Sequence, residues 1–99
     1  MTITWSETAS ASYHELIDKL LERWDVNVAL RLETSVNELI RNIMKNHEFC
    51  PHSIQLDLRK CVVLKLNSLI YKKVSQQEIF IVAFIQNRMD HDYYSSLQD

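Results

Sequence analysis

The first half of the chain repeats its hydrophobic residues at helical spacing. Thr2 to Trp5 alternates polar and apolar side chains, which predicts a short strand. Ser6 follows as a candidate N-cap, with Glu7 in the first turn, where an acidic side chain suits the helix dipole. Beyond it apolar residues recur every three or four positions, which predicts a helix from Glu7 to about Arg23. The residues of this apolar face are Tyr13, Leu16, Ile17, Leu20, Leu21 and Trp24.

A second helical pattern follows after a short interruption. Asp25 and Asn27 break the first pattern and can cap the next helix. That helix should end before Pro51, because the residue preceding a proline is disfavoured in helical geometry. Only a few residues join the two helices, so we expect an antiparallel helical hairpin. The apolar face of the second helix comprises Ala29, Leu32, Val36, Leu39, Ile40, Ile43 and Met44.

After the proline, the pattern changes to that of strands. Lys60 to Leu66, Ser68 to Val74 and Glu78 to Ile85 are short runs rich in β-branched, aromatic and other apolar residues, separated by polar turns. They predict an antiparallel meander. The last run is apolar almost throughout, which indicates a central strand covered on both faces. The sequence has no glycine, so we expect Asn67 to adopt the positive φ that a tight hairpin requires.

These elements together predict one small α+β domain over residues 1–99, in which the strands cover the apolar face of the helical hairpin. The tail from Met89 to Asp99 is polar and predicts either a loose end or a short final helix. No apolar run reaches the roughly 20 residues of a membrane helix, and the N-terminus has no signal-peptide pattern. We therefore expect a cytoplasmic protein without a membrane partner.

Charge is distributed unevenly along the chain. The net charge of −2 argues against a strongly basic nucleic-acid binder, but residues 49–85 carry five basic and two acidic side chains. Such a segment can form a local basic face that binds phosphates or an acidic protein, or simply a solvated sheet face.

The two cysteines are expected to be reduced thiols, because the chain lacks secretory features. His47, Cys50, His52 and Cys61 are ligand types for zinc, but their spacing fits no familiar zinc pattern. We therefore expect ordinary packing roles and no metal.

Several segments, in order, resemble the RelE/ParE superfamily of toxins. Ile3 to Ala9 is similar to the "I-x-W-S-x-x-A" start of that superfamily, and Leu58 to Val63 contains an arginine that begins its second strand. Ser68 to Lys72 resembles its "L-I-Y-x-V" strand. Ile79 to Phe84, with Asn87 and Arg88 beyond it, resembles the last strand and the following arginine. The match spans residues 2 to about 94, and its strength lies in the order and spacing of motifs that are individually weak.

The resemblance implies a growth-inhibiting, plasmid-stabilising toxin of a type II toxin–antitoxin system that a cognate antitoxin neutralises. RelE-like members cut messenger RNA in the ribosome, whereas ParE-like members bind and poison DNA gyrase without hydrolysis. Neither mechanism implies a cofactor. For RNA cleavage, which needs proton transfer and positive charge at the phosphate, the candidate catalytic residues are Arg59, Arg88, His91 and Tyr94. For binding, the candidates are Arg59, Lys65, Tyr71, Lys72, Lys73 and Arg88.

Other interpretations of these residues are open. Arg59 can pair with a carboxylate such as Asp57, Tyr71 can be a core side chain with a hydrogen-bonded hydroxyl, and His91 can be solvated.

The chain also departs from the RNA-cutting relatives. It has Ser68 where they usually carry an arginine, and Asp90 and Asp92 flank His91. Like charge near a scissile phosphate is unfavourable. We therefore favour the ParE-like binding toxin, with gyrase as an example of its target. The alternatives are a ribosome-dependent endonuclease and a non-toxic relative that retains antitoxin binding.

Overall fold

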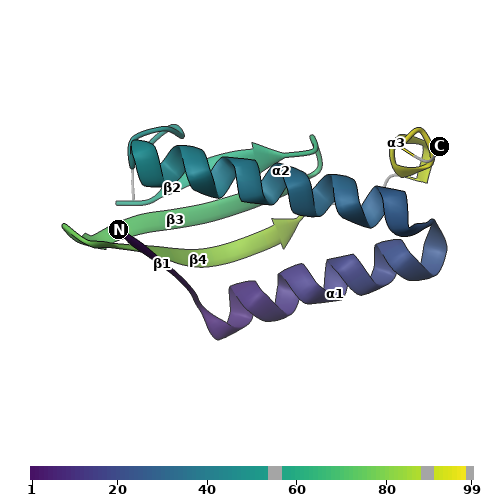
Figure 1. Cartoon of the computed structure of the whole chain (residues 1–99), viewed down its shortest axis with the longest axis horizontal. Helices are drawn as coiled ribbons and strands as arrows, with labels where there is room; N and C mark the ends of the chain where they lie inside the picture. Colours follow the sequence, from purple (N-terminus) through teal and green to yellow (C-terminus); the bar gives the residue numbers. More distant parts are fainter. Residues whose placement is uncertain (54–56, 88–90, 98–99) are drawn as a thin grey trace.

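The computed structural model describes residues 1–53, 57–87 and 91–97, with residues 91 and 92 described by their backbone alone. The elements follow in the predicted order of a strand, two helices and three strands, with a short final helix (Figure 1). They are β1 (Thr2–Trp5), α1 (Glu7–Arg23), α2 (Val26–Lys45), β2 (Arg59–Val63), β3 (Asn67–Ser75), β4 (Glu78–Gln86) and α3 (His91–Ser95).

The four strands form one sheet in the order β1-β4-β3-β2. The three C-terminal strands pair antiparallel, as the meander predicted. The N-terminal strand β1 joins parallel to β4, with Ile3 opposite Ile79 and Trp5 opposite Ile81. The central position of β4 is thereby confirmed.

Both long helices begin at side-chain caps. The Ser6 hydroxyl accepts a hydrogen bond from the Ala9 backbone N–H at 2.9 Å and donates to the Val82 carbonyl at 2.8 Å. The Asp25 carboxylate accepts from the Val28 N–H at 3.2 Å. These caps satisfy backbone donors that the first helical turn leaves unpaired. The Ser6 hydroxyl also ties the start of α1 to the central strand.

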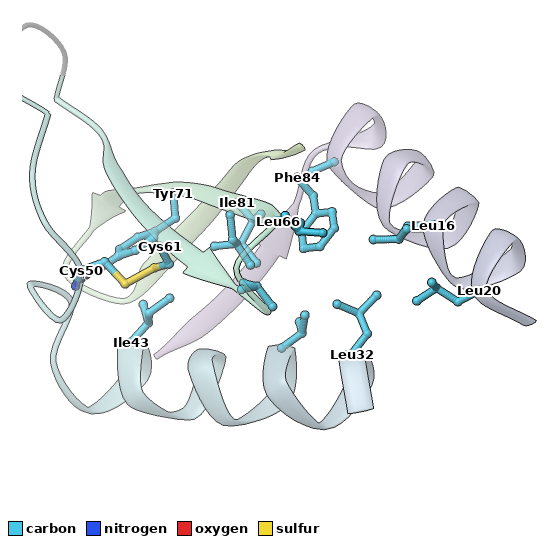
Figure 2. Packing of buried hydrophobic residues seen from close by; sticks show 14 of the residues in the cluster. Leu16, Leu20, Leu32, Ile43, Cys50, Cys61, Leu66, Tyr71, Ile81 and Phe84 are labelled. Atoms are coloured by element: carbon cyan, nitrogen blue, oxygen red, sulfur yellow. Dashed lines mark hydrogen bonds between the residues drawn. A yellow bond between two sulfur atoms is a disulfide. The ribbon is translucent and has the colours of Figure 1, made fainter. Parts of the chain in front are cut away.

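The core lies between the helical hairpin and one face of the sheet (Figure 2). Leu16 and Leu20 of α1, and Leu32 and Ile43 of α2, point toward the sheet and are at most 1% exposed. Residues that alternate along the strands complete the cluster, because successive side chains of a strand point to opposite faces. They include Cys61, Val63, Leu69, Tyr71, Ile79, Ile81 and Phe84.

The opposite face of the sheet is only partly covered. Val62 is 67% exposed and Ile85 is 43% exposed, while Phe80 and Val82 are half-buried. The prediction that the last strand is covered on both faces was therefore wrong. Its physical reason is that α1 and α2 both contribute their apolar faces to the same core cluster.

The first hairpin differs from its prediction. The strand β2 ends at Val63, and Leu64 and Lys65 take positive φ angles of 47° and 65°. Asn67 does not occupy the turn but begins β3, fully buried, and its side-chain Nδ2 donates to the Val63 carbonyl at 3.2 Å and to the Tyr94 hydroxyl at 3.3 Å. The side chain of Asn67 is thus used for buried hydrogen bonds, and Leu64 and Lys65, which have no special preference for the left-handed region, adopt it instead.

Two further features concern the tail and the membrane. The final helix α3 realises one of the two predictions for the tail. Within the described ranges, no helix is both long and apolar enough to cross a membrane.

Candidate functional site

A polar hollow of about 270 Å³ lies where the connection between α2 and β2 meets β2 and β3. Four of the six residues predicted to bind line it, namely Arg59, Tyr71, Lys72 and Lys73, together with His47, His52 and Asp57. The site therefore gathers most of the predicted basic segment.

The backbone explains how these residues come together. Arg59 and Tyr71 are register partners in the antiparallel β2–β3 pair. The connection then folds back against the start of β2, and His52 forms an isolated antiparallel bridge with Arg59. The Lys60 N–H donates to the Pro51 carbonyl at 3.1 Å, and Ser53 N–H donates to the carbonyl of residue 58 at 2.8 Å. These bonds hold residues 51–53 beside the outer edge of β2.

A disulfide between Cys50 and Cys61 closes this folded-back segment (Figure 2). The prediction of reduced thiols was therefore wrong. The antiparallel pairing beside β2 sets the two cysteines opposite one another with a Cα–Cα distance of 5.4 Å, which lies in the normal range for a disulfide. Both cysteines are nearly buried, at 5% and 3% exposure.

Arg59 is held by the connection. Its Nη1 donates to the Cys50 carbonyl at 2.9 Å and more weakly to the Glu48 carbonyl at 3.5 Å, and its Nη2 lies 3.5 Å from the Glu48 carboxylate. A carboxylate partner for Arg59 was one of the predicted interpretations, but the partner is Glu48. Asp57 is instead the partner of His52, whose Nε2 lies 3.2 Å from the Asp57 carboxylate and can donate to it. The Nη1 group of Arg59 is thus engaged with backbone carbonyls of the connection.

Tyr71 has no exposed surface, and its hydroxyl bonds to the same connection. The hydroxyl donates to the His47 carbonyl at 2.6 Å and accepts from the Cys50 N–H at 3.4 Å. Burial raises the pKa of Tyr71 above its ordinary value, while the Cys50 hydrogen bond and the Arg59 charge oppose the rise. The interpretation of Tyr71 as a core side chain with a hydrogen-bonded hydroxyl is confirmed, and this phenol is neutral near pH 7.

The two lysines supply the accessible charge. Lys72 is exposed, and Lys73 is half-buried with its Nζ 3.3 Å from the Gln76 side-chain oxygen. Arg59, Lys72 and Lys73 contribute three positive charges to the lining and Asp57 one negative charge, so these four side chains carry a formal charge of +2. This charge suits an acidic ligand or protein segment.

The remaining predicted residues lie elsewhere. Lys65 is in the β2–β3 turn, with its Nζ 5.7 Å from the Tyr93 ring centroid. Tyr94 is fully buried against Trp24, with ring centroids 5.3 Å apart. Arg88 lies outside the described residues, and the His91 side chain is likewise not among them.

The structure therefore does not bring Arg59 and Tyr94 together. Tyr94 bonds to Asn67, which pairs with Val63 at the end of β2, whereas Arg59 begins that strand. Arg59 and Val63 are four residue steps apart along β2, or roughly 13 Å at about 3.3 Å per residue.

Sequence reasoning missed three residues that line the hollow. It weighed His47 and His52 only as metal ligands and Asp57 only as a partner of Arg59. In the described part of the chain, no group of three or more His, Cys, Asp or Glu side chains is placed to hold a metal ion. The sequence did contain one indication that these residues come together. Cys50 and Cys61 are spaced so that the connection between them, which begins with Pro51, can fold back as a hairpin.

Comparison with known proteins supports the fold. No family model matches the sequence, and no curated protein is similar to it in sequence. Among solved structures, a chain of the "Chromosomal ParDE TA system from P. aeruginosa" superposes with a TM-score of 0.71 at 16% sequence identity. The alignment covers 89% of this chain and 97% of that chain. The predicted α+β fold, with an N-terminal strand, a helical hairpin and three antiparallel C-terminal strands, is confirmed.

Proposed function

We propose that this chain is the toxin of a type II toxin–antitoxin system, that it inhibits growth, and that a cognate antitoxin neutralises it. The observation that carries the proposal is the likeness in fold to a chain of a ParDE system over 89% of this chain and 97% of the other. The sequence motifs in superfamily order support it independently. Fold alone does not determine function, so the mechanism depends on the geometry and charge of the site.

The site favours binding of a target such as DNA gyrase over RNA cleavage. Cleavage by 2′-hydroxyl attack needs a proton acceptor, a proton donor and a cation converging on one phosphate. Arg59 is engaged with Glu48 and the Cys50 carbonyl, and Tyr94 is buried about four strand residues away. The described candidates therefore do not form a converging set, whereas the basic hollow is a surface that an acidic partner can occupy.

The antitoxin has two surfaces available. An acidic segment would be attracted to the hollow beside Lys72 and Lys73, and an apolar segment would cover the partly exposed sheet face around Val62 and Ile85. We place both the toxin and its antitoxin in the cytoplasm.

Induced expression in a bacterial host tests the proposal. We expect growth arrest with messenger RNA intact, rescue by co-expression of the cognate antitoxin, and failure of gyrase supercoiling with purified toxin. Cleaved transcripts in ribosome-bound RNA, lost in Arg88→Ala or His91→Ala, would favour the endonuclease. Normal growth on strong induction would exclude both toxin mechanisms and favour a non-toxic relative that retains antitoxin binding.

A charge reversal tests the role of the hollow. Lys72→Glu should weaken binding of the antitoxin or of the target about tenfold, which corresponds to about 1.4 kcal/mol. Lys19→Glu is the matched control, because Lys19 lies on α1 in an exposed pair with Glu15 that contributes little. Equal effects of the two reversals on binding, measured by calorimetry, would remove the hollow from the interface.

A further inference from the structure

Residues 46–53 form one wall of the hollow through His47 and His52, and Cys50 attaches this wall to the sheet. Its sulfur bonds to Cys61, its N–H donates to the Tyr71 hydroxyl, and its carbonyl accepts from Arg59. Cys50 is thus bonded covalently to β2 through Cys61, and it is hydrogen-bonded to the side chains of Tyr71 and Arg59. The position of Cys50 and the geometry of the hollow are therefore coupled.

The rest of the wall, residues 46–53, has few other attachments in the part of the chain that the structure describes. Beyond the end of α2 it contains no helix and only the single bridge between His52 and Arg59. Its other contacts are two backbone hydrogen bonds, the bond from Tyr71 to the His47 carbonyl, the contacts of Arg59 with Glu48 and the exposed pair of His52 and Asp57. A cross-link over 11 residues of separation restricts such a weakly held segment strongly, because it removes conformational freedom from the open state.

We propose that the Cys50–Cys61 disulfide is a redox-controlled latch that keeps the basic hollow assembled. A dithiol reductant of the thioredoxin class would open it. A thiolate of the reductant attacks one sulfur and forms a mixed disulfide, and the second thiol of the reductant resolves it. Two electrons and two protons pass to the cysteines, which become thiols, while the reductant becomes a disulfide. Residues 46–53 are then released from β2.

Because the two sulfurs are buried, the folded-back segment must open locally before a reductant can reach the disulfide. Cys50 and Cys61 are only 5% and 3% exposed, whereas Pro51 and His52 beside them are exposed. A reductant therefore reaches the disulfide when the folded-back segment opens locally. Disulfides in a reducing compartment are characteristically transient or redox-sensing, which agrees with a latch at a functional site. Control of toxicity by this latch rests on the function proposed above, but opening of the hollow does not.

Hydrogen exchange of the full chain tests the latch without any assay of toxicity. The protein is compared after oxidation with oxidised glutathione and after reduction with dithiothreitol, and free thiols are counted in denaturant. We expect no free thiols in the first state and two in the second. On reduction, amides of residues 46–53 and 59–61 should exchange at least tenfold faster, while those of α1 stay unchanged.

A variant without the cysteines completes the design. Cys50→Ala/Cys61→Ala should exchange like the reduced protein and should not respond to dithiothreitol. Two free thiols after oxidation would overturn the proposal, as would exchange in residues 46–53 that does not depend on redox state. Faster exchange over the whole molecule would also overturn it, because the disulfide would then support the entire fold. Failure of growth arrest with the expected exchange pattern would instead count against the proposed function alone.

Discussion

Removal of one hydroxyl group should loosen the wall of the hollow by a calculable amount. In Tyr71→Phe, the His47 carbonyl loses a donor at 2.6 Å and the Cys50 N–H loses an acceptor at 3.4 Å. Tyr71 has no exposed surface, so water does not readily replace the hydroxyl. A hydrogen bond contributes about 1 kcal/mol net, and loss of both bonds should lower the free energy of unfolding by about 2 kcal/mol.

Urea unfolding followed by tryptophan fluorescence measures this loss. With a denaturant slope of about 2 kcal/mol/M, the midpoint should fall by about 1 M. Tyr13→Phe is the matched control, because Tyr13 is half-buried and no hydrogen bond of its hydroxyl is seen among the described residues. Its midpoint should change by less than about 0.3 M, which corresponds to about 0.5 kcal/mol. Equal midpoints for the wild type and Tyr71→Phe would refute the reasoning that this hydroxyl holds residues 46–53.

Three further changes test other parts of the structure. Ser6→Ala removes both the cap on the Ala9 N–H and the bond to the Val82 carbonyl, and should lower the free energy of unfolding by about 1–2 kcal/mol in the same urea assay. Lys65→Asn places a residue that tolerates positive φ at an angle of 65°, and should raise the thermal midpoint by about 3 °C, whereas a fall would contradict the turn. Because burial raises the pKa of Tyr71 in the folded state, the unfolded chain loses this proton first, so stability should fall as the pH rises above about 10. Unfolding at about pH 9 to 11 should show a shallower fall in Tyr71→Phe.

The helices could be predicted closely because their determinants are local. Ser6 and Asp25 precede the helices as caps, and both perform that role in the structure. The helix α1 has the predicted bounds of Glu7 and Arg23. Strand existence was predicted equally well, since alternation and apolar runs are also read within a few residues.

What could not be predicted depends on contacts between distant segments. The pairing of Cys50 with Cys61 requires the connection to fold back beside β2, and the sequence offered only their ligand-type chemistry. The positive φ of Leu64 and Lys65 follows from the buried position of Asn67, which contacts Tyr94 of the last helix. Local preference for the left-handed region therefore pointed to the wrong residue.

The candidate site was predicted in part. Its basic members share strand β3 or start β2, so the charge of residues 49–85 located them. Arg59 begins β2 and Lys65 follows its end, but the sequence did not predict the folded-back connection that forms the hollow at the Arg59 end. Arg59 and Lys65 are six residues apart in sequence, yet one lines the hollow and the other lies over Tyr93.

Because β1 pairs with β4, the sheet cannot be completed during synthesis until β4 has been made. Thr2 to Trp5 leave the ribosome first, but their partners are residues 78–81, which are made more than 70 residues later. Ile3 and Trp5 pack against the core from this edge, so the helical hairpin emerges with part of its apolar surface unmatched. Long-range closures of this kind slow folding, because chain entropy is lost before the contacts form. A nascent chain stalled before β4 should therefore lack the native sheet, and the interval before its completion gives a co-translationally supplied partner time to bind.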